Sequence, residues 1–251
     1  DLLDRELSVR PSRAIEELYH SVLEAKRTHK LTNRLNIREL SFFGRKQELS
    51  QLEEYLSLVE TGEAVGPFLV MGQSGTGKKR LLRQLVLMSN RSFNFIKVEG
   101  KATSQRYEGS AWNDLRQALE KLGDEMGISL LEEEDDLISV WNQLQILSKE
   151  KPLLILLENA QWIDAVSLEK VKQLEERRNQ EKWQLIFTAE EPLPASFVNF
   201  LGSLKVEKRL SQLELTNFDP SESRALLKGE LGAIEPAVME QMVEWSEGSP
   251  F

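Results

Sequence analysis

The stretch MGQSGTGKKR, Met71–Arg80, decides the fold, because Gly72 to Lys78 has the spacing G-x-x-x-x-G-K. In this pattern the glycines let backbone N–H groups curl around phosphate oxygens, and the helix that follows adds its positive N-terminal end. We expect Lys78 to reach the β- and γ-phosphates of a nucleotide. The pattern normally continues with a Ser or Thr whose hydroxyl holds Mg²⁺, but Lys79 stands there in this sequence.

The flanks of the loop support this interpretation over an ordinary glycine-rich turn. The apolar run Pro67–Met71 precedes the loop, and a helical pattern from Arg80 to Met88 follows it. A phosphate-binding loop requires this order of strand, loop and helix. We therefore expect nucleotide contacts from eight positions of the loop and the first helical turn: Gly72, Ser74, Gly75, Thr76, Gly77, Lys78, Lys79 and Arg80.

Strand and helix patterns alternate along the rest of the chain. Strand-like runs lie at 67–71, 95–98, 153–157 and 183–188, and helical periodicity lies at 12–28, 46–60, 80–88, 111–122, 137–148 and 167–179. The run Leu153–Leu157 has no polar residue, as expected for a parallel strand that helices cover on both faces. After Leu213–Leu215 only helical patterns remain, at 221–230 and 236–246.

These patterns predict an α/β fold: a P-loop NTPase three-layer parallel sheet, with an N-terminal helical segment and a small C-terminal α-helical lid. We place the helical segment at 1–35, the NTPase core at 36–210 and the start of the lid at 211–251. The chain starts within a helical pattern and stops without a closing element. We therefore expect it to be part of a longer protein.

Composition argues against several kinds of partner. The chain has 251 residues and a net charge of −9, so we expect no direct nucleic-acid binding by this fragment. No apolar run approaches the roughly 20 residues that span a bilayer, and the N-terminus does not resemble a signal peptide. Cysteine is absent, and His20 and His29 lie apart outside the α/β core. We expect a cytoplasmic protein with no membrane contact and no metal site built from such residues.

A second candidate site follows the buried run at 153–157. A carboxylate at the end of such a strand is where proteins with this loop hold magnesium and polarise water. Glu158 takes this place and Asp164 follows it, so we expect these two carboxylates to be catalytic. Asn159 cannot act as a general base, because its amide does not titrate in the useful range. Asp164 is explained equally well as the N-cap of a helix that starts at Ala165.

Three segments resemble the signal-transduction ATPases with numerous domains, which are AAA-related switch proteins of bacterial regulators. Ser41–Leu49, SFFGRKQEL, resembles the box that opens their nucleotide-binding domain, and Glu158–Asp164 resembles their D-D-x-Q-W-A-D segment. Gly248–Phe251 resembles their G-N-P-F lid motif. Leu7–Arg27 resembles the tail of the bacterial transcriptional activation domain of antibiotic-regulatory-type activators, so the resemblance covers about residues 7–251.

The resemblance implies a cytoplasmic, nucleotide-gated switch that binds ATP or ADP. Such a protein would self-associate when opened and act on transcription together with other domains of the same longer chain. The resemblance also adds Arg45 and Pro250 to the expected nucleotide contacts, with the proline against the adenine. A surface arginine after a turn is an equally good explanation of Arg45.

Four residues, in three separate motifs, depart from the family's pattern. Lys79 replaces the magnesium-binding hydroxyl, and Glu158 and Asn159 replace an acidic pair. Near Glu190 the family usually has an arginine that senses the terminal phosphate. The negative charge of Glu190 would instead repel phosphate. Loss of one such stabilising group typically slows a reaction by a factor of about 100 or more. We therefore expect weak or absent ATP hydrolysis and regard a bound Mg²⁺ as doubtful.

Three functions stay open at this point. The first is a nucleotide-binding regulatory module of a multidomain bacterial transcriptional regulator. The second is an active ATPase that reassigns the missing roles to Lys79, Glu158 and Asp164. The third is an interaction scaffold that binds no nucleotide and whose loop is closed by its own side chains. We further expect Lys79 to pair with Glu158 in place of the metal, the alternative being that it points to solvent.

Overall fold

The computed structural model describes residues 42–250, except 64, 104–106, 129, 131–135, 150, 179–180, 207–209 and 234. Residues 1–41 lie outside the described residues. The helix predicted at 12–28 and the activator-like segment at 7–27 fall in that part of the chain.

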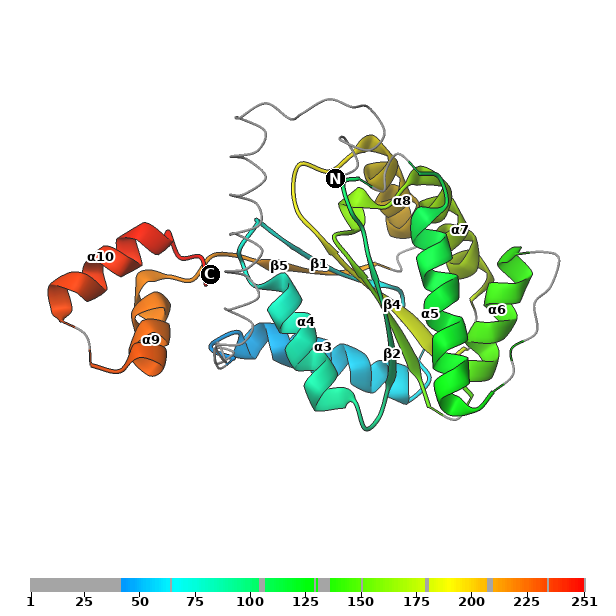
Figure 1. Ribbon diagram of the computed structural model, residues 1–251, viewed down its shortest axis with the longest axis horizontal. Helices are drawn as coiled ribbons and strands as arrows, with labels where there is room; N and C mark the ends of the chain where they lie inside the picture. The colour runs from blue at the N-terminus through cyan, green and yellow to red at the C-terminus, as the bar shows by residue number, and fades with distance from the viewer. Residues whose placement is uncertain are drawn as a thin grey trace, which may run out of the picture. The chain divides into compact units, whose positions relative to one another are not determined.

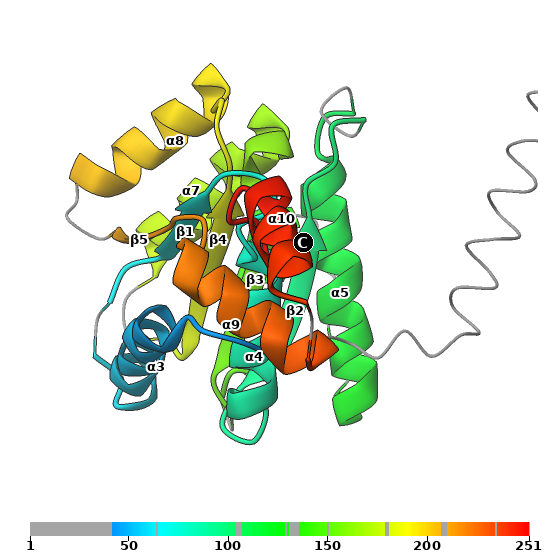
Figure 2. The same ribbon diagram turned by 90° about the vertical axis from the view of Figure 1, so that its left-hand side faces the viewer.

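Five parallel strands form one sheet in the order β2-β3-β4-β1-β5 (Figures 1 and 2). The strands are β1 (Phe68–Gly72), β2 (Asn94–Glu99), β3 (Leu153–Glu158), β4 (Trp183–Ala189) and β5 (Ser211–Leu215). Met71 at the end of β1 lies opposite Ala189 of β4 and Glu214 of β5. The segment that follows β1 therefore leaves the sheet between the carboxyl ends of two neighbouring strands.

Helices cover both faces of this sheet, which confirms the predicted three-layer α/β arrangement (Figures 1 and 2). One face packs against α3 (Lys46–Glu60) and α4 (Lys78–Ser89). The other packs against α5 (Ser110–Met126), α6 (Asp136–Leu147), α7 (Ala165–Arg177) and α8 (Ala195–Val206).

The side chains of β3 show why its first five residues, Leu153–Leu157, are all apolar. Leu153, Ile155 and Leu157 join the core beneath α5 to α8. Leu154 and Leu156 join the core beneath α3 and α4. Successive side chains of a strand point to opposite faces, so a strand that helices cover on both sides buries this whole run in the two cores.

The starts of three helices differ in how the sequence caps them. Asp164 caps α7 by accepting a hydrogen bond from the Ser167 N–H, and Asp219 forms a capping box at the start of α9 (Pro220–Leu231). By contrast, α4 begins after Gly77, which has φ 93° and offers no side-chain cap. The N-cap of α4 thus supplies none of the acceptors that its first-turn N–H groups require.

The C-terminal helices α9 and α10 (Pro236–Ser246) pack against each other after β5, where the sequence predicts a helical lid. β5 itself pairs with β1 within the sheet, although the predicted limit puts 211–215 with the lid. The division of the chain into domains otherwise stays a prediction. No helix in the described part of the chain is long and apolar enough to cross a membrane.

Candidate functional site

The glycine-rich loop, hereafter the P-loop (Gly72–Lys78), connects β1 to α4, which confirms the predicted order of strand, loop and helix. Gly75 and Gly77 have φ of 83° and 93°, a left-handed conformation that glycine adopts without strain. A Cβ atom on Gly72 would lie 2.6 Å from the carbonyl oxygen of Leu215, at the end of β5. The glycine at position 72 is therefore needed for the close approach of β5.

Lys78 is buried, and its ammonium group lies inside the P-loop. Its Nζ donates hydrogen bonds to the carbonyl oxygens of Gly72 and Gln73, each at 2.8 Å, and lies 3.3 Å from Oε2 of Glu190. Burial lowers the pKa of Lys78 below its ordinary value, although the Glu190 carboxylate acts in the opposite direction. The sequence identified Glu190 as a departure, but its pairing with the P-loop lysine could not be read from the sequence.

Lys79 points away from the P-loop toward the ends of β2 and β3. Its Nζ forms an ion pair with Oε1 of Glu99 and lies 3.8 Å from Oε2 of Glu158. The predicted pairing of Lys79 with Glu158 is therefore present, but Glu99 is the closer partner. The sequence reasoning missed Glu99, which the parallel register places opposite Glu158.

The charges of this cluster are mutually stabilised. The hydrogen bond from Lys79 holds the pKa of Glu99 below its ordinary value, and the same contact raises the pKa of Lys79. Glu158 is buried and forms a second ion pair with Lys97, at 2.8 Å. The amide of Asn159 donates to Oε1 of Glu99 at 3.2 Å. We refer to these five residues as the Lys79 cluster.

The Lys79 cluster does not fit Mg²⁺ in the place where the loop pattern normally holds it. Magnesium requires oxygen ligands in near-octahedral geometry. Lys79 replaces the hydroxyl with an ammonium group, and two lysine side chains approach the Glu158 carboxylate. Among the residues that the structure describes, no group of three or more His, Cys, Asp or Glu side chains is arranged to hold a metal ion.

Asp164 connects the start of α7 with the start of α5 through its carboxylate. Its carboxylate accepts hydrogen bonds from the N–H groups of Ser167 and Gly109, at 2.9 and 2.8 Å, and from the Ser167 hydroxyl at 2.7 Å. Burial would raise the pKa of Asp164, but these hydrogen bonds outweigh burial and lower it. Both oxygens are thus engaged in holding the starts of α5 and α7 together. The geometry favours the N-cap explanation over the expected catalytic role.

Arg45 is buried, with only 8% of its surface exposed. It is therefore not a surface arginine, which was one of the two explanations that the sequence allowed. Its Nη2 donates to the carbonyl oxygen of Thr76 at 3.3 Å and to that of Thr216, and its guanidinium lies 4.5 Å from the Phe218 ring centroid. Arg45 therefore connects the P-loop with the segment that leads from β5 to the lid. Its contact with a nucleotide stays a prediction.

The segment after α10, Glu247–Pro250, returns to the P-loop, and we call it the lid strap. The Ser249 hydroxyl donates to the carbonyl oxygen of Gly75 at 3.3 Å. A Cβ atom on Gly77 would lie 3.5 Å from Cγ of Pro250. The carbonyl oxygen of Gly248 accepts a hydrogen bond of 2.8 Å from the Phe218 N–H. The predicted lid motif thus lies beside the predicted phosphate site.

The remaining predicted contacts also lie in or next to the P-loop. Thr76 is buried, and its hydroxyl donates to the carbonyl oxygen of Gln73 at 2.9 Å. Ser74 is exposed in the loop, and Arg80 is half-buried in the first turn of α4. Their contacts with a nucleotide stay predictions.

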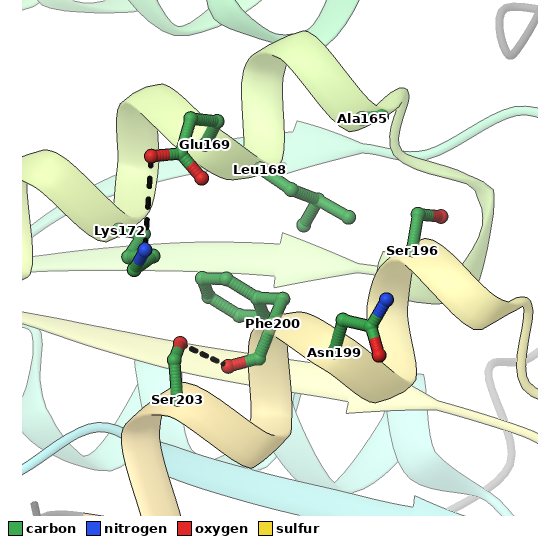
Figure 3. A pocket seen from close by; sticks show the side chains of 8 residues that line it. All are labelled: Ala165, Leu168, Glu169, Lys172, Ser196, Asn199, Phe200 and Ser203. Atoms are coloured by element: carbon green, nitrogen blue, oxygen red, sulfur yellow. Dashed lines mark hydrogen bonds and ion pairs between the residues drawn. The ribbon is translucent and has the colours of Figure 1, made fainter.

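A separate pocket lies between α7 and α8 (Figure 3). Leu168 and Phe200 form its apolar part, and Lys172 lies 3.7 Å from Glu169 at its edge. None of the site residues predicted from the sequence lines this pocket. We assign it no part in nucleotide binding.

Comparisons with known proteins agree with the fold and the loop. The sequence profile of the AAA ATPase domain family matches residues 41–187. A comparison with curated protein sequences gives no significant match. The solved structure of the Aeropyrum pernix ORC2 protein in its ADP form is 14% identical, with a TM-score of 0.59, over 85% of this chain and 62% of that chain.

Two further solved structures have lower TM-scores. The Aeropyrum pernix ORC1 protein, solved in complex with DNA, is 17% identical, with a TM-score of 0.54, over 84% of this chain and 57% of that chain. A signal-transduction ATPase with numerous domains and a tetratricopeptide-repeat sensor, from Pyrococcus horikoshii, is 14% identical, with a TM-score of 0.45, over 84% of this chain and 29% of that chain. The last similarity is too low to support a closer relationship.

At these identities the solved structures show a shared fold alone, and this chain spans 57% and 62% of the two ORC proteins. The family profile is more informative, because it covers more than half of the 251 residues and includes the P-loop, Glu158 and Asp164. The chain therefore belongs to the AAA ATPase domain family.

Proposed function

We propose that this chain is a nucleotide-binding regulatory module that holds ATP or ADP without Mg²⁺ and hydrolyses ATP slowly or not at all. The observation that carries this proposal is the contrast between the two neighbouring lysines. Lys78 keeps its ammonium inside the P-loop, at 2.8 Å from two loop carbonyls, whereas Lys79 joins the ends of β2 and β3. The phosphate cradle is thus kept, and the metal position is replaced by an ion pair.

Nucleotide binding is supported by the charge at the start of α4. The helix follows Gly77 without a side-chain cap, so its first-turn N–H groups and the positive end of its dipole favour an anion. Lys78 adds a full positive charge in a buried position. Phosphate oxygens can accept hydrogen bonds from the first-turn N–H groups of α4 and from the Lys78 ammonium at the same time. An ordinary glycine-rich turn has no need for these two kinds of donor in one place.

Slow hydrolysis is supported by the state of Glu158. A carboxylate that polarises water must accept a proton or orient the attacking oxygen. Glu158 is instead buried between Lys97 and Lys79, at 2.8 and 3.8 Å. Two ammonium groups thus already contact the carboxylate that would have to polarise the water. Asn159 donates its amide to Glu99 and supplies no second carboxylate.

A regulatory role is supported by the lid strap. Ser249 contacts the carbonyl of Gly75, and Arg45 joins Thr76 of the P-loop to Thr216 before the lid. A nucleotide in the P-loop would alter both contacts and so change how the lid is held. Together with the activator-like segment at 7–27, this supports a cytoplasmic module of a multidomain bacterial transcriptional regulator. There it would act through other domains of the same chain and through nucleotide-dependent self-association, without itself binding nucleic acid or membrane.

A second candidate is the nucleotide-free interaction scaffold. It is favoured by the contacts of Lys78, whose ammonium bonds to Gly72, Gln73 and Glu190 within the chain itself. Such contacts close the P-loop by its own groups, as the scaffold hypothesis requires. The two candidates differ in whether phosphates can replace these acceptors.

Calorimetric titration of the 251-residue chain with ADP and with ATP, in EDTA, distinguishes the candidates. We expect binding to the natural chain and a loss of about 10- to 100-fold in affinity in Lys78→Ala, because a hydrogen bond to a charged group contributes about 1.5–3 kcal/mol. The control is Lys121→Ala, which removes the same charge from an exposed position 3.8 Å from Glu125. The control is expected to bind as the natural chain does.

Two results would overturn the proposal. Absence of binding by either nucleotide to the natural chain would favour the scaffold. Phosphate release from ATP with Mg²⁺, lost in Lys78→Ala and kept in Lys121→Ala, would show an active ATPase with reassigned residues.

A further inference from the structure

Glu190 has a fixed position next to the P-loop. It directly follows Ala189, the last residue of β4, and Ala189 lies opposite Met71 at the end of β1. Its N–H donates to Oε1 of the buried Gln161 at 3.3 Å. Its carboxylate reaches Nζ of Lys78 at 3.3 Å, and its side chain remains 28% exposed. The backbone is thus anchored, while the carboxylate faces the space around the P-loop lysine.

The ammonium of Lys78 has three N–H donors, and three acceptors already surround it. Two are the carbonyl oxygens of Gly72 and Gln73, and the third is Oε2 of Glu190. The carbonyls belong to the P-loop, whereas Glu190 approaches from β4. Glu190 is therefore the one anionic acceptor among the three.

A diphosphate and a triphosphate make different demands on this arrangement. The lysine of a P-loop reaches both the β- and the γ-phosphate when a triphosphate is bound. A diphosphate needs one acceptor place on Lys78, which it can take from a loop carbonyl while Glu190 stays paired. A triphosphate needs a second place and brings its terminal phosphate toward the Glu190 carboxylate, where like charges repel at short range and low dielectric.

We propose that Glu190 makes this site specific for nucleoside diphosphates, because its carboxylate takes the place of the terminal phosphate on Lys78. The proposal rests on the proposed function, since it concerns which nucleotide the P-loop holds. It names a specificity-determining residue in this chain and predicts that ADP is the bound form. The repulsion that the sequence suggested between Glu190 and phosphate then acts on the γ-phosphate alone, while the β-phosphate is still held by Lys78 and the start of α4.

The test is titration calorimetry of ADP and ATP, each in EDTA, with the natural chain, Glu190→Gln and the control Glu191→Gln. Glutamine keeps the size of the side chain and removes its charge, and Glu191 is an exposed neighbour whose substitution changes the net charge equally. We expect the natural chain and Glu191→Gln to bind ADP at least tenfold more tightly than ATP. In Glu190→Gln the ATP affinity rises at least tenfold, and the ADP affinity changes less than threefold.

The outcomes separate the two proposals. Equal affinities of the natural chain for ADP and ATP overturn the diphosphate specificity and leave the proposed function standing. A preference for ADP that is the same in Glu190→Gln also overturns it, because the carboxylate then has no part in the choice. Absence of binding by both nucleotides overturns the proposed function itself.

Discussion

Among single residues, Asp164 shows most clearly how a conspicuous carboxylate can serve the fold. It accepts hydrogen bonds from the backbone N–H groups of Gly109, Ala111 and Ser167 and from the Ser167 hydroxyl. Its segment resembles a catalytic motif, but a side chain whose oxygens hold two helix starts is already engaged. The family resemblance drew attention to Asp164, but the N-cap pattern before Ala165 explains its contacts better than a catalytic role does.

We predict that Asp164→Ala lowers the free energy of unfolding by about 2–4 kcal/mol. The change removes an N-cap, which contributes about 1 kcal/mol, and leaves buried donors unsatisfied, at about 1–3 kcal/mol. Urea denaturation at pH 7 measures the loss. Asp114→Ala, on the exposed side of α5, is the control and is expected to change stability by less than about 0.5 kcal/mol. Equal losses in the two variants would contradict the anchoring role.

The pH dependence of this contribution has a definite sign. The pKa of Asp164 is lowered in the folded chain, so its carboxylate stabilises the fold fully above the unfolded pKa of about 3.9. This contribution is lost as the pH falls through the folded pKa. The difference in stability between the natural chain and Asp164→Ala should therefore shrink in acid, as denaturation at a series of pH values below 4 would show.

The sequence predicted the residues of the P-loop well and their partners poorly. The motif fixes Lys78 at the start of a helix, because strand, loop and helix are local in sequence. The contact of Lys79 with Glu99 depends on β2 lying next to β3 in parallel register. The contact of Arg45 with Thr216 joins segments far apart in the chain. Such contacts can be predicted only when the order of the strands in the sheet is known.

Among the elements, α8 and β5 were the hardest to predict. The segment ASFVNFLGSLKV of α8 is mostly apolar, so its periodicity does not separate one buried face from one polar face. β5 is short, and only Leu213 and Leu215 along it are buried. Both elements take their form from packing on the sheet. The helix at 46–60 and the strand at 153–157 were predicted well, because their patterns are strong.

The lid strap yields a prediction at the scale of elements. Gly248 has φ 76°, and a Cβ atom there would overlap the carbonyl oxygen of Phe218. Gly248→Ala should lower the free energy of unfolding by about 1–2 kcal/mol for the left-handed conformation, and by about 1–3 kcal/mol more for the steric overlap. Urea denaturation measures the loss, and limited proteolysis between β5 and α10 should show faster cleavage.

Gly127→Ala is the matched control for this experiment. Gly127 is the left-handed C-cap of α5, with φ 68° and ψ 25°, and a Cβ atom there would meet nothing within 4 Å. This variant bears the conformational cost without the overlap, at about 1–2 kcal/mol. If both variants lose the same stability and are cleaved at the same rate, the lid strap is not held against Phe218 in the way described.

At the scale of the whole molecule, one loop motif and the alternation of strands and helices were enough to predict the layered α/β fold. The order β2-β3-β4-β1-β5 was not predictable from them, because it follows from long-range pairing. That order brings Glu190, which follows β4, to one side of the P-loop and Thr216, which follows β5, to the other. The functional proposal depends on this placement more than on any single motif.

The central claim is that the Lys79 cluster replaces the metal, and thermal unfolding with ADP tests it most directly. The chain is heated with ADP in EDTA, with ADP and Mg²⁺, and with neither. A ligand that binds only the folded form stabilises it by about 2.7 kcal/mol at a hundredfold excess over Kd. We predict an upward shift in Tm with ADP that is the same in EDTA and in Mg²⁺. A shift that appears only with Mg²⁺, or no shift at millimolar ADP, would contradict the account.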